Sequence, residues 1–398
     1  MGILRLNIKG FRSLRDVTWE PGRLNVVIGP NGSGKSNLLR ALMLLQRAAE
    51  GDLADSVMGM GGIAPLLWDG QAQELEWRVR VDPMGANRDP VREALTYDLQ
   101  LRRLGGGSSY RIEHEMLANW HLHEQGQAEA PKKFLERRPG HAVTFDSQER
   151  RLVAVEGSVP DEQALLGLVG GPFASPIVAG FREMVRGWSM YHDVQTDSRA
   201  PLRQAAVARM VRRVSSDGEN LIPVLHTLYT GDREFKRVVD DAMRAAFSED
   251  YEELVFPPAA DQRVQLRVRW RSLRTEQSAA DLSDGTIRFL LLLAILGKPT
   301  PGSVIAIDEP EAGLHPSMLP IVAEHAVSAS EQAQVILTTH SPQFLDAFTA
   351  MPPTTTVTRW EDGETRLGVV DGDELARWLQ RYSLGSLYKS GELEGMAA

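Results

Sequence analysis

The 398-residue sequence contains no cysteine, which excludes disulfide bonds and metal sites built on thiolates. It also lacks a long apolar run, because the longest stretch, Phe289 to Leu296, is far below the ~20 residues that a membrane-spanning helix needs. The first residues do not resemble a secretory leader, since apolar and polar side chains alternate from Ile3 to Lys9. We therefore expect a cytoplasmic protein with no membrane partner.

Sustained heptads and internal repeats are missing as well, and the lack of heptads excludes a long coiled-coil arm. The formal net charge of −9 argues against indiscriminate coating of nucleic acid, although a local basic face could still bind DNA. The composition is that of a globular protein. Its 42% hydrophobic residues are ample for a sizeable core, and the length allows two or three domains.

The hydrophobic pattern changes along the chain. Residues 1–49 read as strand, turn, strand, glycine-rich loop and helix, and residues 74–157 read as an antiparallel meander. From 161 to 247 the period becomes helical, and after Leu266 an α/β pattern returns. The pattern predicts an α/β fold with a mixed sheet core, an antiparallel β lobe and an inserted helical lobe. The predicted division is 1–157, 158–260 and 261–398.

One helix of the inserted lobe shows a clear apolar face between charged residues. The apolar residues of this face are Phe235, Val238, Val239, Ala242 and Met243. The residues assigned to the polar side are Asp232, Arg233, Lys236, Arg237 and Asp240. This spacing predicts an amphipathic helix that packs on the lobe by one side.

The strongest motif is GPNGSGKS at residues 29–36, which fits the phosphate-loop pattern G-x-x-x-x-G-K-[ST] at every fixed position. An apolar strand, 24–28, precedes it and a helical run, 37–42, follows it, as the motif requires. Lys35 would reach the β- and γ-phosphates, and the Ser36 hydroxyl would bind magnesium. A plain glycine turn is the alternative. The predicted nucleotide-binding residues are Gly29, Asn31, Gly32, Ser33, Gly34, Lys35, Ser36 and Asn37. The predicted ligand is a nucleoside triphosphate with Mg²⁺.

Two acids end the apolar run that begins at Ser303. A buried parallel strand delivers such carboxylates at its C-terminal edge. Asp308 would hold the magnesium through water, and Glu309 would act as general base on the attacking water. Two acids that merely start a loop are the alternative.

Ser283 stands before a helical run that starts near Ile287, where it could cap the helix and nothing more. A serine hydroxyl and the Gly285 N–H at a helix N-terminus also make an anion site. Because this loop comes shortly before the Asp-Glu pair, it resembles the signature loop of the ATP-binding cassette superfamily, which reaches the γ-phosphate held by a partner subunit.

A second apolar strand, 335–339, ends in His340. Such a histidine is often structural. Beside a phosphate loop, an Asp-Glu pair and a signature-like loop, however, His340 is the candidate for the switch histidine that contacts the γ-phosphate and the catalytic water. His315 is the rival candidate. It lies in the segment 313–316, which resembles the dimer-contact loop of the same superfamily.

Taken together, these motifs resemble the RecF/OLD-type ATPases, which are stand-alone relatives of SMC heads. The residues that carry the resemblance are 8–14 (IKGFRSL), 34–37 (GKSN), 282–286 (LSDGT) and 308–316 (DEPEAGLHP). Transporter ATPases usually carry threonine where Asn37 stands, and a Gly-Gly-Gln signature. The resemblance implies ATP as the nucleotide and a head-to-tail homodimer, in which Ser283 of one copy meets the nucleotide on Lys35 and Ser36 of the other.

Two features of the family are absent or unplaced. OLD nucleases append a TOPRIM domain, whereas only about fifty to sixty residues follow Ser341, near the lower limit for a domain. We therefore expect any nuclease or other effector to be encoded separately. In the family, a loop with a glutamine links the two lobes. The sequence does not decide whether Gln46, Gln71 or Gln195 has this role.

The macromolecule on which such an ATPase acts is indicated only by clusters of basic residues. The alternating run Arg263, Arg267, Arg269 and Arg271 would place four guanidinium groups on one strand face, suited to a phosphate backbone, or would simply be a solvated face. The same two readings apply to the pairs at 132–133 and 137–138 and to Arg209 with residues 212–213. The first hypothesis is action on duplex DNA in repair or phage defence. The alternatives are a nucleotide-gated protein-interaction module and the ATPase subunit of a transporter.

Overall fold

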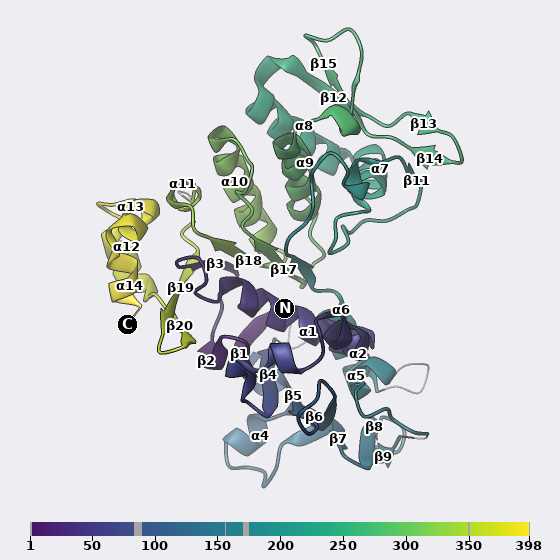
Figure 1. Cartoon of the computed structure of the whole chain (residues 1–398), viewed down its shortest axis with the longest axis vertical. Helices are drawn as coiled ribbons and strands as arrows, with labels where there is room; N and C mark the ends of the chain where they lie inside the picture. The colour runs from purple at the N-terminus through teal and green to yellow at the C-terminus, as the bar shows by residue number, and fades with distance from the viewer. Residues whose placement is uncertain (1, 83–89, 156, 170–174, 349–350, 398) are drawn as a thin grey trace.

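The computed structural model describes residues 2–82, 90–155, 157–169, 175–348 and 351–397, and two large β-sheets dominate it (Figure 1). The first is antiparallel and has eight strands. Their order is β2 (Leu14–Trp19), β1 (Ile3–Phe11), β4 (Glu74–Val81), β5 (Leu95–Arg103), β6 (Tyr110–Asn119), β7 (Lys132–Arg138), β8 (His141–Asp146) and β9 (Arg151–Ala154). The predicted meander is therefore extended at one edge by the first two strands of the chain.

The second sheet has six strands and forms the centre of the molecule. Their order is β10 (Ser189–Tyr191), β17 (Val304–Asp308), β18 (Gln334–Thr339), β3 (Leu24–Ile28), β19 (Thr354–Glu361) and β20 (Glu364–Val369). All neighbouring pairs are parallel except β19 and β20. The expectation of a mixed sheet is confirmed.

Both faces of the central sheet are covered, which explains why its inner strands β3, β17 and β18 are mostly apolar and buried. Alternate residues of β17 point to opposite sides. Val304 and Ala306 belong to the core shared with the antiparallel sheet, and Ile305 and Ile307 belong to the core on the other side. The central sheet thus separates two hydrophobic cores.

Helices complete each core (Figure 1). On the side of the antiparallel sheet lie α1 (Lys35–Glu50), α2 (Leu53–Gly59), α5 (Leu165–Leu168) and α6 (Pro176–Arg186), together with the short α4 (His121–Glu124). The short α3 (Pro90–Glu93) contacts α4. On the other side lie α7 (Leu221–Gly231), α8 (Arg233–Phe247), α9 (Asp284–Leu296) and α10 (Leu319–Ser330). At the C-terminal end follow α11 (Pro342–Asp346), α12 (Gly372–Trp378), α13 (Leu384–Ser390) and α14 (Glu392–Met396). Among the described residues, no helix is long and apolar enough to cross a membrane.

The predicted inserted lobe contains the expected helices α7 and α8, and two small sheets of three strands each pair its strands with strands from residues 263–278. The first sheet is β11 (Ala206–Val207), β14 (Arg263–Val264) and β13 (Pro258–Ala259), and the second is β12 (Tyr251–Val255), β15 (Arg267–Trp270) and β16 (Gln277–Ser278). In the same part of the sequence, α6 packs on α1, and β10 joins the central sheet. The division at residues 157 and 260 stays a prediction.

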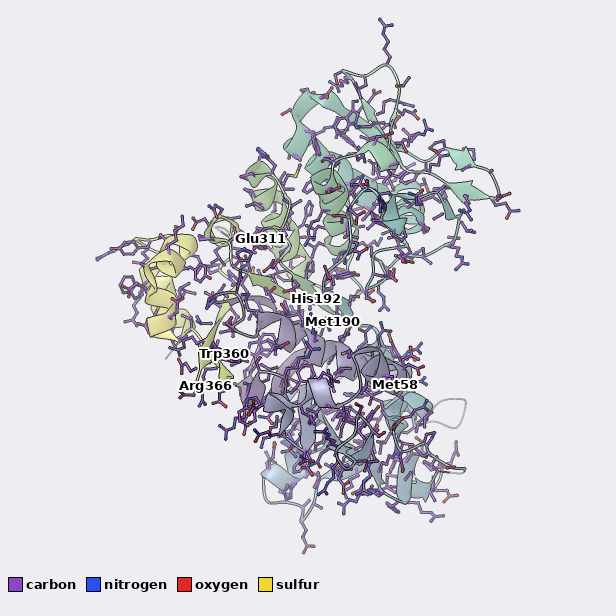
Figure 2. The ribbon with its side chains drawn as sticks, viewed as in Figure 1. Met58, Met190, His192, Glu311, Trp360 and Arg366 are labelled. Carbon is purple, nitrogen blue, oxygen red and sulfur yellow. The ribbon has the colours of Figure 1, made fainter. Side chains whose placement is uncertain are left out.

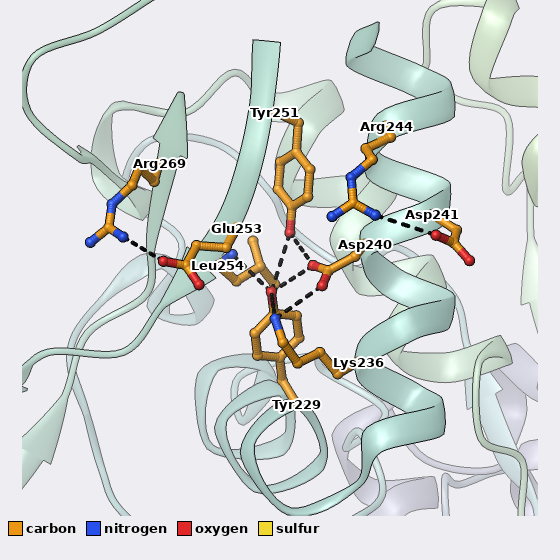
Figure 3. Close-up of polar contacts among 9 residues, drawn as sticks. All are labelled: Tyr229, Lys236, Asp240, Asp241, Arg244, Tyr251, Glu253, Leu254 and Arg269. Atoms are coloured by element: carbon orange, nitrogen blue, oxygen red, sulfur yellow. Dashed lines mark hydrogen bonds and ion pairs between the residues drawn. The ribbon is translucent and has the colours of Figure 1, made fainter. Parts of the chain in front are cut away.

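The amphipathic helix is α8, and it differs from the expectation at Asp240, which is buried. Its carboxylate accepts hydrogen bonds from the hydroxyls of Tyr229 at 2.5 Å and Tyr251 at 2.7 Å, and Lys236 pairs with it at 3.0 Å (Figure 3). Burial is tolerated because the carboxylate is fully partnered. Asp240, which the helical period alone assigns to solvent, therefore links α7, α8 and β12 through its hydrogen bonds.

The arginine row is also different from the expectation. A break after Val264 puts Arg263 in β14, whereas Arg267 and Arg269 lie in β15, which belongs to another sheet, and Arg271 lies beyond the end of β15. Arg269 is held between the carboxylates of Glu253 and Glu276. The four guanidinium groups therefore do not form one continuous face.

Candidate nucleotide-binding site

The predicted motifs meet at one edge of the central sheet. Because β3, β17 and β18 are parallel, their C-terminal ends lie side by side, with Asp308 opposite Thr338 and Thr339 opposite Ile28. The phosphate loop (residues 29–36) follows β3, and His340 follows β18. This edge is where an open α/β sheet binds its ligand.

Lys35, the first residue of α1, is buried, and its ammonium donates to the carbonyls of Gly29 at 2.7 Å and Pro30 at 3.0 Å. Burial lowers the pKa of the Lys35 ammonium, while the negative charges of Glu309 and Asp308 oppose this shift. A cation is thus held at the phosphate loop, close enough to interact with the carboxylates at the end of β17, which lies two strands from β3.

Asp308 is the best-partnered of these acids. Burial by itself would raise its pKa, but hydrogen bonds from His192, Thr338 and Ser36 outweigh burial, and the pKa of Asp308 lies below its ordinary value. The carboxylate is therefore ionised and lies within hydrogen-bond reach of the Ser36 hydroxyl.

These oxygens fit Mg²⁺, which prefers hard oxygen ligands and keeps several waters. In the described part of the chain, no group of three or more His, Asp or Glu side chains could hold a metal ion. Ser36 and Asp308 would accordingly hold Mg²⁺ together with phosphate oxygens and water, and the ion would neutralise the phosphate charge.

Glu309 follows β17 with a left-handed backbone, φ 47°, an unusual conformation for a residue other than glycine. Its carboxylate lies 3.0 Å from Nδ1 of His340, and both side chains are partly exposed. His315 is placed elsewhere, since it caps the short turn at Pro316–Met318. The structure thus brings His340, the preferred candidate, to Glu309.

The signature loop (residues 282–286) has the predicted helix cap. The Ser283 hydroxyl accepts a hydrogen bond from the N–H of Thr286 at 3.1 Å, and Ser283 thereby caps the N-terminus of α9. A Cβ added to Gly285 would lie 2.7 Å from the carbonyl oxygen of Gly313, so the signature loop packs against the segment 313–316. The two loops that the sequence assigned to dimer contact are therefore neighbours.

Threonine hydroxyls of β19 and β20 form hydrogen bonds to the phosphate loop. Thr358 bonds the Ser33 hydroxyl at 2.5 Å, and Thr365 donates to the Ser33 carbonyl at 2.9 Å. The Asn37 amide donates to Ser13 at 2.8 Å. The side chains of Ser33 and Asn37, both predicted to bind nucleotide, are thus used within the protein. Their backbone N–H groups also donate within the loop, to the carbonyls of Pro30 at 3.2 Å and Gly34 at 3.0 Å.

Gly34 illustrates this constraint and gives a first prediction. Its φ is +103°, and an added Cβ would lie 2.1 Å from the Thr365 hydroxyl. Gly34→Ala should lower the unfolding free energy by about 2–4 kcal/mol, because strain and overpacking add. The control is Gly32→Ala, where φ is +81° and the added Cβ has no atom of the described residues within 4 Å apart from its chain neighbours, so that only strain of about 1 kcal/mol applies. Equal melting temperatures for the two variants would contradict this account of the loop.

Four further side chains lie near the site, and the sequence assigned none of them a role there. His192, just after β10, contacts Asp308 at 2.5 Å through Nδ1 and Arg40 at 2.7 Å through Nε2, near the junction of the lobes (Figure 2). Arg288 of α9 donates to the Glu309 carbonyl at 2.8 Å. Nε of Arg288 and Nε of Arg12 are buried and have no hydrogen-bond partner among the described residues, and burial lowers the pKa of both guanidinium groups. Guanidinium groups with an unused donor of this kind fit an anionic ligand.

The structure also places the three glutamines left open by the sequence. Gln46 is buried in α1 and donates to the Trp188 carbonyl at 3.0 Å, whereas Gln71 and Gln195 are exposed. The side chain next to Asp308 is instead His192. Only the short apolar strand before it, 189–191, could have indicated this position, and three residues are too few to recognise.

Comparison with known proteins agrees with this geometry. Residues 24–346 match the family described as "AAA domain, putative AbiEii toxin, Type IV TA system". No curated protein matches the sequence.

Solved structures with the same fold include an SMC head bound to the C-terminal winged-helix domain of ScpA (TM-score 0.54, 15% identity, 95% of this chain and 100% of that one). Another is an SMC head with an extended coiled coil bound to the C-terminal domain of ScpA from Pyrococcus furiosus (TM-score 0.52, 14% identity, 95% and 98%). The chain therefore belongs to the AbiEii-type AAA family, with the P-loop fold of an SMC head.

Proposed function

We propose that two copies of this chain bind ATP and Mg²⁺ between them and hydrolyse the γ-phosphate bond. The observation that carries the proposal is the meeting of Lys35, Asp308, Glu309 and His340 at one sheet edge. Lys35 binds the β- and γ-phosphates, and Ser36 with Asp308 holds the metal. Glu309 accepts a proton from the attacking water, and His340, within 3.0 Å, orients the carboxylate and contacts the γ-phosphate.

The partner copy supplies the signature loop. Ser283 and the Gly285 N–H, at the start of α9, offer an anion site, and the helix dipole favours negative charge there. Packing of this loop against the segment 313–316 supports a shared dimer face. Nucleotide binding then brings the copies together, and hydrolysis separates them.

This proposal predicts that ATPase activity depends on protein concentration. Because the active species is a dimer, turnover per chain should rise with total protein at saturating ATP and Mg²⁺ and then level off. Phosphate release across a dilution series measures this. Turnover per chain that stays constant down to concentrations at which light scattering finds only monomers would refute the composite site.

Duplex DNA is the proposed target, with a separately encoded effector such as a TOPRIM-type nuclease completing a repair or defence system. The support comes from the resemblance to RecF/OLD ATPases and from the exposed side chains of Arg209, Arg212 and Arg213 on the inserted lobe. Among the described residues these three have no ion pair, unlike Arg269. They are therefore available for contact with phosphate.

The corresponding prediction is that the triple change of Arg209, Arg212 and Arg213 to alanine weakens duplex binding at least tenfold at low salt. The slope of log affinity against log salt should fall by up to about 2.7, at ~0.9 per lost contact. The control removes three arginines that already have carboxylate partners, Arg237, Arg244 and Arg271. Fluorescence anisotropy with a non-hydrolysable ATP analogue measures both variants, and equal losses would contradict the assignment.

A nucleotide-gated protein-interaction module is the second candidate. It is favoured by the fact that the two similar SMC heads are described in complex with a protein, ScpA. Absence of salt-dependent DNA binding in the ATP-loaded protein would select this candidate. Co-purification with a membrane protein would instead select the transporter ATPase.

A further inference from the structure

Arg203 ends a short turn, Pro201–Arg203, between β10 and β11, and its side chain is 1% exposed. A guanidinium remains charged at neutral pH, and burial of a charge is costly unless it is fully hydrogen-bonded. The sequence gives no sign of this, because an arginine in a polar loop is usually exposed.

The guanidinium of Arg203 is completely used, and most of its partners belong to the signature loop or to the turn before it. Nη1 donates to the carbonyls of Ala279 at 3.0 Å and Leu282 at 2.5 Å. Nη2 donates to the carboxylate of Asp284 at 2.5 Å. Nη2 and Nε also donate to the carbonyl of Thr196, at 2.8 and 3.0 Å.

These contacts fix the residues on both sides of Ser283. The Leu282 carbonyl and the Asp284 carboxylate are both hydrogen-bonded to the rigid, planar guanidinium of Arg203. These two bonds fix the backbone on either side of Ser283, and so they fix the direction of its hydroxyl and of the following N–H groups. A lysine ammonium is a single point charge and cannot reproduce this fork. Thr196 lies four residues after His192, which contacts Asp308, so the same arginine braces the signature loop against the segment next to the metal-binding acid.

We propose that Arg203 is the positioning residue of the signature loop: it holds Ser283 and Gly285 in the conformation that receives the γ-phosphate of the nucleotide bound by the partner copy. This inference rests on the proposed ATP-dependent dimer. It assigns Arg203 to the site of the other subunit, not to the site formed by its own phosphate loop.

The assignment can be tested by complementation. Arg203→Lys should bind ATP with an affinity within about twofold of wild type, because its own phosphate loop is intact, and should lose turnover at least tenfold. Lys35→Ala has the reverse defect. In a 1:1 mixture, half of the dimers should pair the intact phosphate loop of the first variant with the intact signature loop of the second, which should restore about a quarter of wild-type turnover.

A parallel mixture of Ser283→Arg with Lys35→Ala separates the two proposals. If both mixtures regain activity, the inference is supported. If only the Ser283 mixture does, Arg203 acts in its own site and the inference fails, while the composite dimer stands. If neither does, the composite dimer itself is overturned.

Asp284→Ala serves as a second variant in case Arg203→Lys does not fold, since the Asp284 side chain is 65% exposed and its loss leaves Arg203 and the backbone in place. It should reduce turnover severalfold with unchanged ATP affinity, and the mixture with Lys35→Ala should restore activity. A loss of ATP affinity in Asp284→Ala, or a failure to complement, would count against the inference.

Discussion

Lys35→Ala should abolish measurable ATP binding. The ammonium is buried at the phosphate loop, where its hydrogen bonds to two loop carbonyls can be exchanged for bonds to phosphate oxygens. Each hydrogen bond between charged groups contributes about 1.5–3 kcal/mol, so the loss of contacts to two phosphates should weaken binding by roughly 10²- to 10⁴-fold.

Calorimetric titration with ATP and Mg²⁺ measures this effect. Lys9→Ala is a suitable control, because that lysine is half-exposed and pairs with Asp16 in the antiparallel sheet, so its affinity should match wild type. ATP affinity within a few-fold of wild type in Lys35→Ala would mean that the ligand does not occupy the phosphate loop.

Glu309→Gln should keep ATP binding and lose turnover. The glutamine has nearly the same shape, but its amide cannot accept the proton of the attacking water, and general base catalysis contributes about 10²- to 10⁴-fold. Its Oε1 can still contact His340, so the local geometry should persist. Single-turnover phosphate release under saturating ATP measures the chemical step directly.

The matched control is Glu311→Gln, two residues further along the chain. Glu311 is largely buried, burial raises the pKa of its carboxyl group, and Thr339 donates to it, which a glutamine oxygen can also accept. It should therefore retain far more turnover than Glu309→Gln. Normal hydrolysis by Glu309→Gln would remove this residue as the general base.

The sequence predicted the parts of the site that carry motifs. The phosphate loop, Asp308 and His340 each follow an apolar run, and parallel pairing of those runs brings their ends together without any further information. The fold class followed from the same runs and from the alternating pattern of residues 74–157.

The supporting groups could not be predicted because their partners are distant in sequence. Thr365 reaches Ser33 across 332 residues, and His192 reaches Asp308 across 116. Neither residue has a local pattern that marks it. The prediction of one basic strand face from the arginine run was wrong for a different reason. Alternating residues share a face only while the strand continues, and the chain passes from one small sheet to another after Val264.

Light scattering of Glu309→Gln, combined with a count of bound nucleotide, tests the shared ATP site most directly. With ATP and Mg²⁺ the protein should have twice the monomer mass and hold one ATP per chain, and addition of Ser283→Arg to the same molecule should return it to a monomer that still binds ATP. An ATP-saturated Glu309→Gln protein that remains a monomer would contradict the account.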